Sequence, residues 1–523
     1  MTTKRMLLAA ALAAATSLTS PAFAQSVLRL DEVAVGELDP AKASDYADSI
    51  LMFNVYDTLV LPRQGGPGHD PHLATAWEVD GSSYTFTLRD DVTFQSGNPL
   101  RAADVVYSLE RMQAMGQGLS YLFSGVTAEA VSEHSVRFTL EEPYAPFVAS
   151  LVRLPIVDQM LVEENATGDD PWAEAFLSAN GAGTGAYMVS SHNPQSETVM
   201  AVNDGYFLPI NDAAPDQVRL RYGLEAATVR TLLAQGEHDI ASQWLPPEVI
   251  RALAADGAQL LTESGTGAFY VKLNTTRPPL DDVNCRRALS HAFDYGTAMQ
   301  MIAITDEISQ GSPATGAIPV GMFGANGPEM SLSRDMAAAE AAMEACPYAP
   351  EDWNLEITWI AEVPIEERFA LLMQANFAEL GISSSIETLP WALFTERVST
   401  PENTPHISQI FVNAVTGDPD TLLYGMYHSS VPGTWQSPEY LDDAAVDAAL
   451  EAGRVGATDA EREAAYGQLN ARLMELAPTI YGFDRQSVFA ASDRVRAPAL
   501  SDPDMAFGLD GMGFSFRLME MVE

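Results

Sequence analysis

Cysteine is scarce in this chain of 523 residues, which contains only Cys285 and Cys346. In an oxidising compartment the two could pair, and closing a loop of about 60 residues would stabilise the fold by roughly 4 kcal/mol through chain entropy. The sequence does not give their separation, so a disulfide and two free thiols both remain open. Neither cysteine lies near the N-terminus, which argues against a lipid anchor of the bacterial lipoprotein kind.

Positive charge is also scarce. The chain has 28 Lys and Arg against 71 Asp and Glu, for a formal net charge of −43, and its lysines are Lys4, Lys42 and Lys272. Binding to nucleic acid is excluded as a function, because phosphate recognition needs clustered cations, and anionic lipid would be repelled. Such acidity is typical of a saline, extracellular habitat. Attraction of cationic ligands is the alternative, which net charge alone does not establish.

Long hydrophobic runs are absent apart from one segment at the N-terminus. Lys4 and Arg5 precede the apolar residues 6–18, and residues 22–24 (AFA) form a small-x-small cleavage pattern. This is a secretory signal peptide over residues 1–24, because its apolar run is too short to span a bilayer. Cleavage would leave Gln25 at the N-terminus. We expect a soluble protein that diffuses freely in a Gram-negative periplasm.

Catalytic and metal-binding motifs are missing. The sequence has no G-x-S-x-G elbow, no P-loop, no H-E-x-x-H and no EF-hand spacing. Gly181, Gly183 and Gly185 are spaced as in a turn rather than a dinucleotide loop. His69 and His72 flank a proline in a predicted loop, so we expect no metal site there. The sequence therefore predicts a protein that is not an enzyme and holds no cofactor.

The remaining features predict several α/β bodies. Removal of 24 residues leaves 499, too many for one hydrophobic core, and a hydrophobic content of 47% is ordinary for a globular protein. Alternation at Tyr84, Phe86 and Leu88 predicts a β-hairpin within an α+β unit of residues 65–180. Helices and strands alternate over residues 181–273 and again from residue 274, which indicates two α/β lobes.

Local signals place several helix ends in the second lobe. Asp281 and Asp282 can cap the helix that follows them, and Gly381 suits the end of a helix over residues 366–380, between two strands expected to be parallel. Thr458 and Glu461 have the spacing of a capping box. We interpret Asp418 as the N-cap and Pro419 as the first residue of a helix over 421–427. The strand that ends the first lobe is expected over residues 269–273.

With these elements placed, the chain resembles the bacterial extracellular solute-binding proteins of family 5, the peptide- and nickel-binding receptors of ABC importers. The stretches that carry the resemblance are 56–59 (YDTL), 71–78 (PHLATAWE), 84–94 (YTFTLRDDVTF), 97–100 (GNPL), 103–109 (ADVVYSL), 111–112 (RM), 183–187 (GTGAY), 273–282 (LNTTRPPLDD), 287–294 (RALSHAFD), 391–394 (WALF) and 417–420 (GDPD). They span essentially the whole mature chain.

The resemblance implies a two-lobed periplasmic-binding-protein fold, class II-like, with an extra α+β accessory domain. Lobe 1 would be discontinuous, built from residues 25–64, 181–273 and 480–523. The accessory domain would take residues 65–180, and lobe 2 would take residues 274–479. A ligand would lie between the lobes, which close by hinge motion.

The same resemblance gives the candidate binding residues. Trp391 matches a pocket-lining tryptophan and could stack on a sugar or a side chain. Tyr46 and Asp45 map close to a ligand-facing loop, Asn413 lies where a lobe-2 strand reaches the cleft, and Arg397 is the cation nearest to Trp391. Each of the five could equally serve an ordinary surface or packing role.

The two charged anchors that dipeptide-binding relatives use are not matched here. Their aspartate for the ligand's amino group aligns with Val415, and their arginine for the ligand's carboxylate aligns near Ile360. An apolar residue cannot replace a buried charge, so a standard dipeptide should bind poorly.

We therefore expect a monomeric receptor that binds a peptide or a similar small polar solute and delivers it to an ABC permease and ATPase complex. The ligand could instead be an oligosaccharide, a metal chelate or another polar nutrient. A sensory binding protein and a secreted hydrolase are the alternatives from other functional classes, and the absence of a nucleophile constellation argues against the hydrolase.

Overall fold

The computed structural model describes residues 25–32, 36–66, 68–456 and 458–522. The predicted signal peptide, residues 1–24, lies outside the described residues. Among the helices that the structure describes, none combines the length and apolar character needed to cross a membrane.

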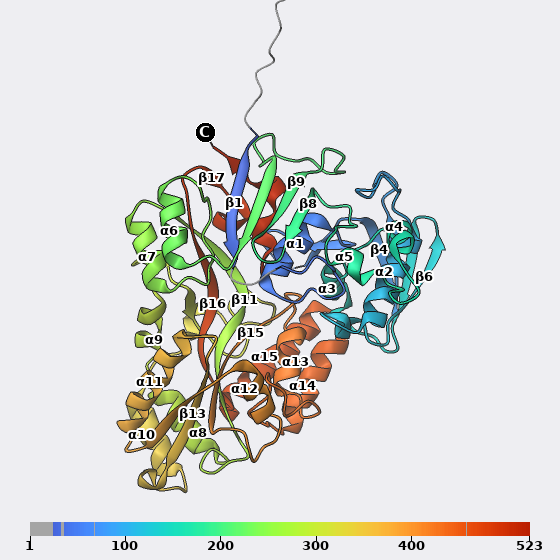
Figure 1. Cartoon of the computed structure of the whole chain (residues 1–523). Coiled ribbons are helices and arrows are strands. Elements are labelled where there is room, and N and C mark those ends of the chain that lie inside the picture. The colour runs from blue at the N-terminus through green and yellow to red at the C-terminus, as the bar shows by residue number, and fades with distance from the viewer. Residues whose placement is uncertain (1–24, 33–35, 67, 457, 523) are drawn as a thin grey trace, which may run out of the picture.

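The upper body in Figure 1 is built on a four-stranded sheet in the order β1-β10-β9-β8. β1 runs parallel to β10, and the other pairs are antiparallel. The bounds are β1 Val27–Glu32, β8 Tyr187–Asn193, β9 Glu197–Val202 and β10 Gln217–Tyr222.

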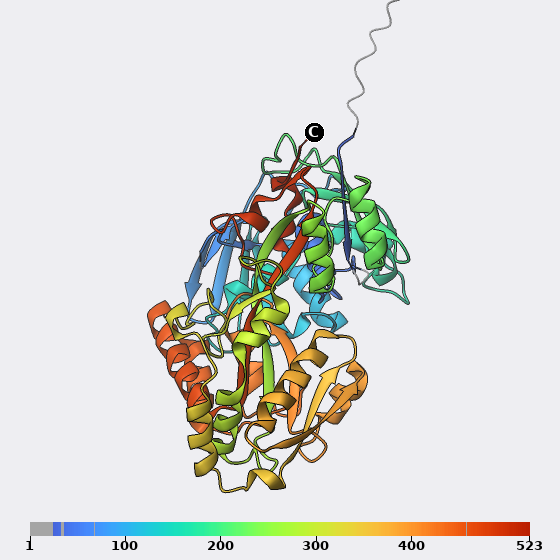
Figure 2. The same cartoon turned by 90° about the vertical axis from the view of Figure 1, so that its left-hand side faces the viewer.

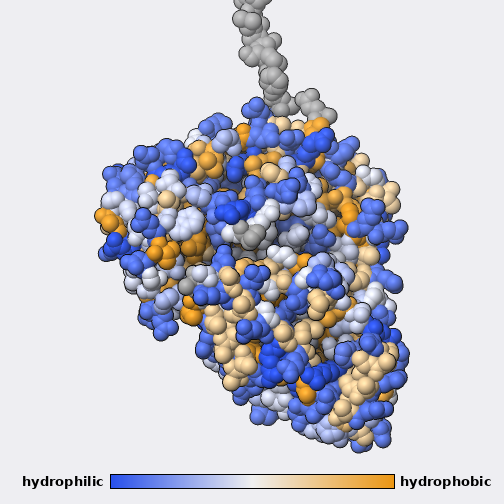
Figure 3. Space-filling model, turned by 180° about the vertical axis from the view of Figure 1, so that it is seen from behind, coloured by the Kyte–Doolittle hydropathy of each residue, from blue (hydrophilic) through white to orange (hydrophobic). Residues whose placement is uncertain are grey.

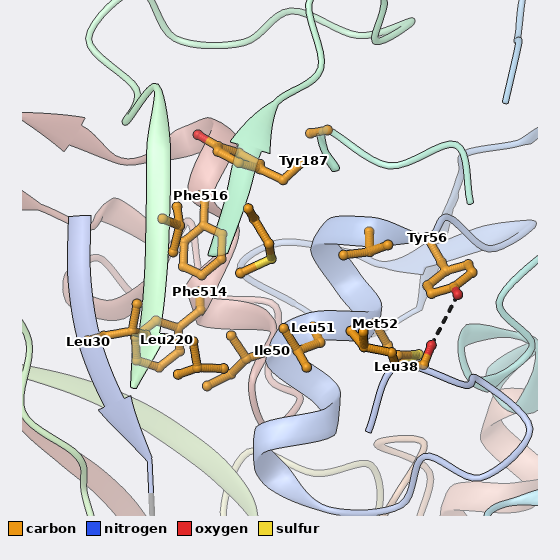
Figure 4. Packing of buried hydrophobic residues seen from close by; sticks show 14 of the residues in the cluster. Leu30, Leu38, Ile50, Leu51, Met52, Tyr56, Tyr187, Leu220, Phe514 and Phe516 are labelled. Atoms are coloured by element: carbon orange, nitrogen blue, oxygen red, sulfur yellow. Dashed lines mark hydrogen bonds between the residues drawn. The ribbon is translucent and has the colours of Figure 1, made fainter. Parts of the chain in front are cut away.

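Helix α1 (Tyr46–Val55) packs against this sheet together with the end of the chain. Figure 4 shows Leu30 and Leu220 of the strands facing Ile50 of α1 and Phe514. The amide of Asn54 donates to the Phe514 carbonyl (2.8 Å), so residues 460 positions apart share one core. Burial of these aromatic and branched side chains is the main stabilising term of this body.

The accessory unit lies at the right of Figure 1 and has its own antiparallel sheet in the order β4-β5-β7-β6. Its elements are β4 Ala74–Asp80, β5 Ser83–Leu88, α2 Ala102–Met115, β6 Thr127–Ser132 and β7 Ser135–Thr139. β4 and β5 form the predicted hairpin, which is confirmed. Arg111 of α2 donates to both carboxylate oxygens of Asp39 (2.6 Å each), and this buried pair ties the unit to the upper body.

The lower body contains a six-stranded sheet in the order β12-β16-β11-β15-β13-β14. The bounds are β11 Gln259–Leu273, β12 Gly311–Pro313, β13 Asn354–Ile360, β14 Ser383–Leu389, β15 Ile407–Asn413 and β16 Thr479–Ala491. Successive residues of β11 point to opposite faces: Phe269 and Val271 enter one core, and Ala268 and Tyr270 enter the other. Helices therefore cover both faces of this sheet.

The remaining helices complete these layers. They are α3 Phe147–Ser150, α4 Gln159–Asn165, α5 Glu174–Leu177, α6 Ala226–Ala234, α7 Pro247–Ala255, α8 Val283–Ala292, α9 Tyr295–Ile302, α10 Met336–Ala345, α11 Ile365–Ala378, α12 Trp391–Arg397, α13 Asp420–Tyr427, α14 Ala444–Val455, α15 Asp459–Leu476 and α16 Pro498–Ser501. Two short strand pairs, β2 Val60–Pro62 with β3 His69–Pro71 and β17 Val495–Arg496 with β18 Glu520–Met521, lie outside the large sheets. Short 3₁₀ turns include Leu151–Arg153, Met512–Phe514 and Phe516–Leu518.

Strands β11 and β16 join the upper and lower bodies. Figures 1 and 2 show both strands running from one body into the other. They pair antiparallel over most of their length, with register shifts between Ser264 and Ala268 and between Phe269 and Tyr270. The two bodies are therefore held together by a two-stranded ribbon that is irregular at its middle.

Most of the local signals in the second lobe are confirmed. Asp282 caps α8 by accepting from the amides of Asn284 and Cys285, Gly381 follows α11 with φ of 80°, and Thr458 and Glu461 form a capping box. β13 and β14 are parallel. The strand expected over residues 269–273 begins at Gln259, because Gly265 and Gly267 interrupt the apolar alternation within β11.

The interpretation of Asp418 as a helix N-cap is wrong. Pro419 is the N-cap of α13, and Asp420 is its first residue. Both oxygens of Asp418 instead accept from Nη2 of Arg462 in α15 (2.8 and 2.7 Å), and Oδ1 also accepts from the Asp420 amide (3.0 Å). The Asp418 carboxylate therefore serves a buried ion pair with Arg462, which lies 44 positions away in the sequence.

Cys285 of α8 and Cys346, the residue after α10, form a disulfide with an S–S distance of 2.08 Å. The bond links two helices of the lower body that pack on the same face of its sheet. It closes a loop between residues 61 positions apart.

We expect the double substitution Cys285→Ser and Cys346→Ser to lower the free energy of unfolding by about 2–4 kcal/mol, because the unfolded chain regains the entropy of that loop. Urea denaturation of the oxidised proteins measures the difference. A reducing agent should destabilise the natural chain by a similar amount and leave the double variant unchanged. Equal stability of the two proteins in oxidising buffer would contradict this expectation.

Candidate ligand-binding cleft

A cavity of about 920 Å³ lies between the accessory unit and the lower body. Residues 121–126 and 140–144 of the accessory unit form one wall, apart from Phe123. Helices α13 and α14 and the segment between them form the other wall, with Asp420, Tyr424, Gln436 and Arg454. This volume falls within the range of small-molecule sites, and a gap between domains is their usual location.

A network of polar contacts joins the two walls. The Tyr144 hydroxyl donates to Oδ2 of Asp420 (2.6 Å), and the Ala145 amide donates to the Arg454 carbonyl (2.8 Å). The Arg454 guanidinium lies 3.9 Å from the ring centroid of Tyr424 and 5.1 Å from that of Tyr144. Burial raises the pKa of Asp420 to about 6. The accessory unit is thus fastened to the lower body at the edge of the cavity.

Arg153 connects all three bodies. It ends the 3₁₀ turn Leu151–Arg153 of the accessory unit. Its Nε donates to the Val415 carbonyl of the lower body, and its Nη1 donates to the Ser49 hydroxyl of α1 in the upper body (3.1 Å). Its charge acts on Tyr121 in the cavity wall, so Arg153 lies near that wall, although it is not one of the lining residues.

A second group of polar residues surrounds the upper half of the β11–β16 ribbon. Glu263 of β11 accepts from the Tyr46 hydroxyl (2.6 Å) and from the amides of Gly511 and Gly513 (3.2 and 2.8 Å). Burial and the nearby Asp510 raise the pKa of Glu263 to about 7. Burial and the charge of Glu263 raise the pKa of Tyr46 well above its usual value.

Arg485 of β16 also belongs to this group and lies on its solvent side. Its Nη2 donates to the Gln243 side chain (2.7 Å), and its Nη1 lies 3.7 Å from Asp510. The guanidinium also covers the Trp244 ring at 4.5 Å, and Trp244 is 46% exposed. An exposed indole beside buried charges is typical of a surface that meets a ligand.

The structure places Tyr46 and Asn413 beside strand β11, at different residues of that strand. Tyr46 lies in the Glu263 group, and Asn413 ends β15 opposite Gly267, with its Oδ1 buried and without a hydrogen-bond partner among the described residues. Only glycine fits at 267, because a Cβ there would lie 1.8 Å from that oxygen. Asp45 is exposed at the N-cap of α1, one residue before Tyr46.

The other two lie farther along the lower body. Trp391 is 39% exposed at the start of α12, and its ring centroid lies 5.3 Å from that of Trp435, which neighbours Thr434 and Gln436 of the cavity wall. Arg397 lines a separate shallow recess of about 510 Å³ with Arg277 and Glu356. It is paired there with Glu387. Contact of these five residues with a ligand stays a prediction.

Sequence reasoning missed Arg153, Glu263, Arg485 and Trp435. Glu263 is one of 71 acidic residues, and its sequence neighbours carry no motif. Arg153 was overlooked because it belongs to the accessory unit, which the sequence does not place next to the lobes. Trp435, in a loop between two helices, had no periodic signal.

The positions that align with the charged anchors of dipeptide-binding relatives carry no charge. Val415 presents its backbone carbonyl to Arg153. Ile360 is buried at the end of β13, and its amide donates to Glu366 (2.8 Å). That a dipeptide would lack both anchors here stays a prediction.

His69 and His72 do not form a pair. His72 is buried and hydrogen bonded to Asp57 (2.7 Å), which also accepts from Thr184 and Tyr206. Within the described ranges, no group of three or more His, Cys, Asp or Glu side chains is arranged to hold a metal ion.

Figure 3 shows the face of the molecule seen from behind. Hydrophilic residues cover most of it, and hydrophobic residues form small separate patches. No extended apolar area is visible on this face that would suggest a protein interface there. The cavity and the Glu263 group therefore remain the candidate site.

Comparison with known proteins supports the fold. The family described as "Bacterial extracellular solute-binding proteins, family 5 Middle" matches residues 69–434. The chain is 28% identical over 469 residues to the probable D,D-dipeptide-binding periplasmic protein DdpA of Escherichia coli, covering 88% of each chain. It is 26% identical over 448 residues to heme-binding protein A of Haemophilus influenzae, covering 78% of each.

Among solved structures, the ABC transporter substrate-binding protein CtaP of Listeria monocytogenes superposes with a TM-score of 0.82 at 20% identity. The match covers 95% of this chain and 100% of that one. A likeness at this identity shows the fold. The predicted two-lobed α/β fold of periplasmic binding proteins is confirmed.

We expect Glu263 to make the stability of the protein depend on pH. Its pKa in the folded state, about 7, lies above the ordinary value of 4.5, so its contribution to stability is fully present below pH 4.5 and is lost as the pH rises through 7. Glu263→Gln should therefore gain stability relative to the natural chain between pH 5 and pH 8, by up to about 3 kcal/mol. Urea denaturation at each pH measures this difference.

Glu129→Gln is a suitable control, because Glu129 is an exposed residue paired with Arg137. Its stability difference from the natural chain should not change over the same pH range. A difference between Glu263→Gln and the natural chain that stays constant from pH 5 to pH 8 would contradict the assignment.

Proposed function

The chain belongs to the bacterial extracellular solute-binding proteins of family 5, which are not catalytic, and we propose that it captures a peptide or similar small polar solute for an ABC importer. The ligand would be enclosed between the lower body and the bodies above it, and the closed receptor would deliver it to the permease and ATPase complex at the inner membrane. The receptor would act as a monomer in the periplasm, released from its signal peptide after Ala24.

The observation that carries this proposal is the cavity of about 920 Å³ with its polar fastening at Tyr144 and Asp420. The two residues come from different bodies, so their contact exists only when those bodies are close. Closing around a ligand removes water from it and strengthens each polar contact that it makes. A cavity fastened in this way supports capture by enclosure.

The β11–β16 ribbon supplies the hinge. The register shift between Ser264 and Ala268 lies midway along β11, where Gly265 and Gly267 lack side chains that would restrict the backbone. Rotation at a few residues between two rigid bodies is the usual form of domain closure.

Peptide is the ligand class that the relatives favour, since DdpA is named for D,D-dipeptides. Val415 and Ile360 provide no charged anchor, which argues against simple dipeptides bound in the manner of the dipeptide-binding relatives. The paired rings of Trp391 and Trp435 favour a second candidate, a solute with a flat face such as an oligosaccharide. Heme-binding protein A is a relative named for a non-peptide ligand.

A thermal-shift screen tests the proposal. The compounds are di-, tri- and tetrapeptides, neutral oligosaccharides and metal chelates, each added to the mature protein. A compound that binds only the folded state raises the melting temperature. We expect a large shift from at least one longer or modified peptide or other polar solute, and no strong shift from a simple dipeptide. A large shift with a simple dipeptide would refute our interpretation of Val415 and Ile360.

We expect Tyr144→Phe to weaken binding of the strongest compound by about three- to tenfold. Loss of one hydrogen bond to a carboxylate should make closure of the protein around the ligand less favourable by on the order of 1 kcal/mol. Isothermal titration calorimetry measures the affinity, and X-ray scattering measures how far the ligand compacts the protein. Tyr348→Phe is the matched control, since Tyr348 donates to Asp281 on the exposed surface (2.9 Å). Equal affinity of both variants would count against closure at Tyr144.

A further inference from the structure

Arg153 is a part-buried cation without an acidic partner among the described residues. No carboxylate oxygen lies within 4.0 Å of its guanidinium in the part of the chain that the structure describes. Of the buried cations, Arg111, Lys272 and Arg462 each pair with an aspartate or a glutamate. Arg286, also buried, donates instead to three backbone carbonyls at the end of α15 and before α8.

The surroundings of Arg153 compensate its charge only in part. Its two hydrogen bonds go to neutral oxygens, the Val415 carbonyl and the Ser49 hydroxyl, and its guanidinium lies 5.2 Å from the Phe53 ring centroid. Asp510 acts on it from beyond ion-pair distance and is itself the neighbour of Arg485. Burial lowers the pKa of Arg153 to about 10, so the side chain stays protonated at neutral pH. A charge removed from water in this way favours any anion that reaches it.

The position of Arg153 also fits a ligand contact. It is held at the junction of the accessory unit, α1 and the loop after β15, which are the three parts that enclose the candidate site. Its charge acts on Tyr121, whose side chain is exposed and lines the cavity. The cation therefore lies next to the cavity wall, at the point where the three parts meet.

The outer part of the cavity has the opposite charge. Glu141, Glu142 and Glu451 line it and are exposed, while Arg454 is already paired with Asp420. A ligand that meets both regions would do so best with an anionic end inside and a neutral or cationic end outside.

We propose that Arg153 is the anion anchor of the ligand site, and that the natural ligand is a solute with a carboxylate or other anionic group placed against this guanidinium. The inference rests on the proposed solute-binding function and narrows its ligand class. It assigns the anchor to the accessory unit, whereas the position near Ile360 that the relatives suggest carries no cation. A zwitterionic peptide could place its carboxylate against Arg153 and its amino group near the glutamates of the cavity.

Val415 offers a test beyond removal of the charge. Its carbonyl accepts from Arg153, so Val415→Asp introduces a carboxylate on a residue that contacts the guanidinium through its backbone. Val415→Asp should then compete with an anionic ligand while it leaves the positive charge of Arg153 in place. A merely structural role of Arg153 would not be disturbed by an added partner.

The experiment starts from the thermal-shift library and adds each peptide as its free acid and as its C-terminal amide, together with small dicarboxylates. Calorimetry with the strongest compound then compares the natural chain with Arg153→Gln, Arg153→Lys, Val415→Asp and a control, Arg137→Gln, whose arginine is exposed on β7 and pairs with Glu129. Circular dichroism and the melting temperature without ligand show that each variant is folded.

We expect the strongest compound to carry an anionic group and to bind at least tenfold more weakly to Arg153→Gln and to Val415→Asp. Arg153→Lys should retain more affinity than Arg153→Gln, and Arg137→Gln should bind within twofold of the natural chain. Weaker binding of the C-terminal amide would assign the anion to the peptide terminus, and unchanged binding of an acidic peptide amide would assign it to a side chain.

The inference is overturned if the strongest compound has no anionic group, or if Arg153→Gln and Val415→Asp both bind it within twofold of the natural chain. Strong binding of a neutral compound would support the proposed solute-binding function and refute only the role of Arg153 as an anion anchor. If no compound of any class shifted the natural chain, the proposed function itself would fail.

Discussion

The antiparallel pairing of β11 with β16 is the constraint on which the rest of the structure depends. These two strands belong to the core of the lower body and continue as the wall of the upper body, so they set the distance between the two. The cavity, the Tyr144–Asp420 contact and the position of Arg153 all require this distance. Because the ribbon is irregular at its middle, it can fix the spacing and still permit rotation.

Buried charge has two different uses in this molecule. Arg111 with Asp39 and Lys272 with Glu439 are ion pairs with almost no solvent exposure, and in each the opposite charges face each other. Such pairs specify which surfaces meet, because one partner left alone would be strongly unfavourable. Arg153 lies at a comparable junction but is satisfied only by neutral oxygens and a ring. Arg111 and Lys272 thus serve the fold, whereas the guanidinium of Arg153 remains available to an anionic group of a ligand.

Much of the fold could be predicted because its signals are local. Alternation at Tyr84 and Phe86, the capping box at Thr458 and the parallel strands around α11 depend on residues close in sequence. The role of Asp418 was assigned wrongly because its partner, Arg462, lies 44 residues away and no local pattern indicates that contact. The candidate site was mostly beyond reach for the same reason: Glu263 meets Gly513 and Arg153 meets Val415 only after the chain has folded, and no spacing in the sequence reports either contact.

The core of the upper body has a consequence for the order of events in synthesis. Asn54 is hydrogen bonded to the backbone of Phe514 and Phe516, and the latter contact spans 462 residues. The first helix therefore cannot reach its native surroundings until residues 514–516 have been made. Loop closure over such a length is slow compared with local folding, so the early part of the chain stays open while the rest emerges. If the chain is exported unfolded through a membrane channel, as the proposed signal peptide implies, it benefits from that delay.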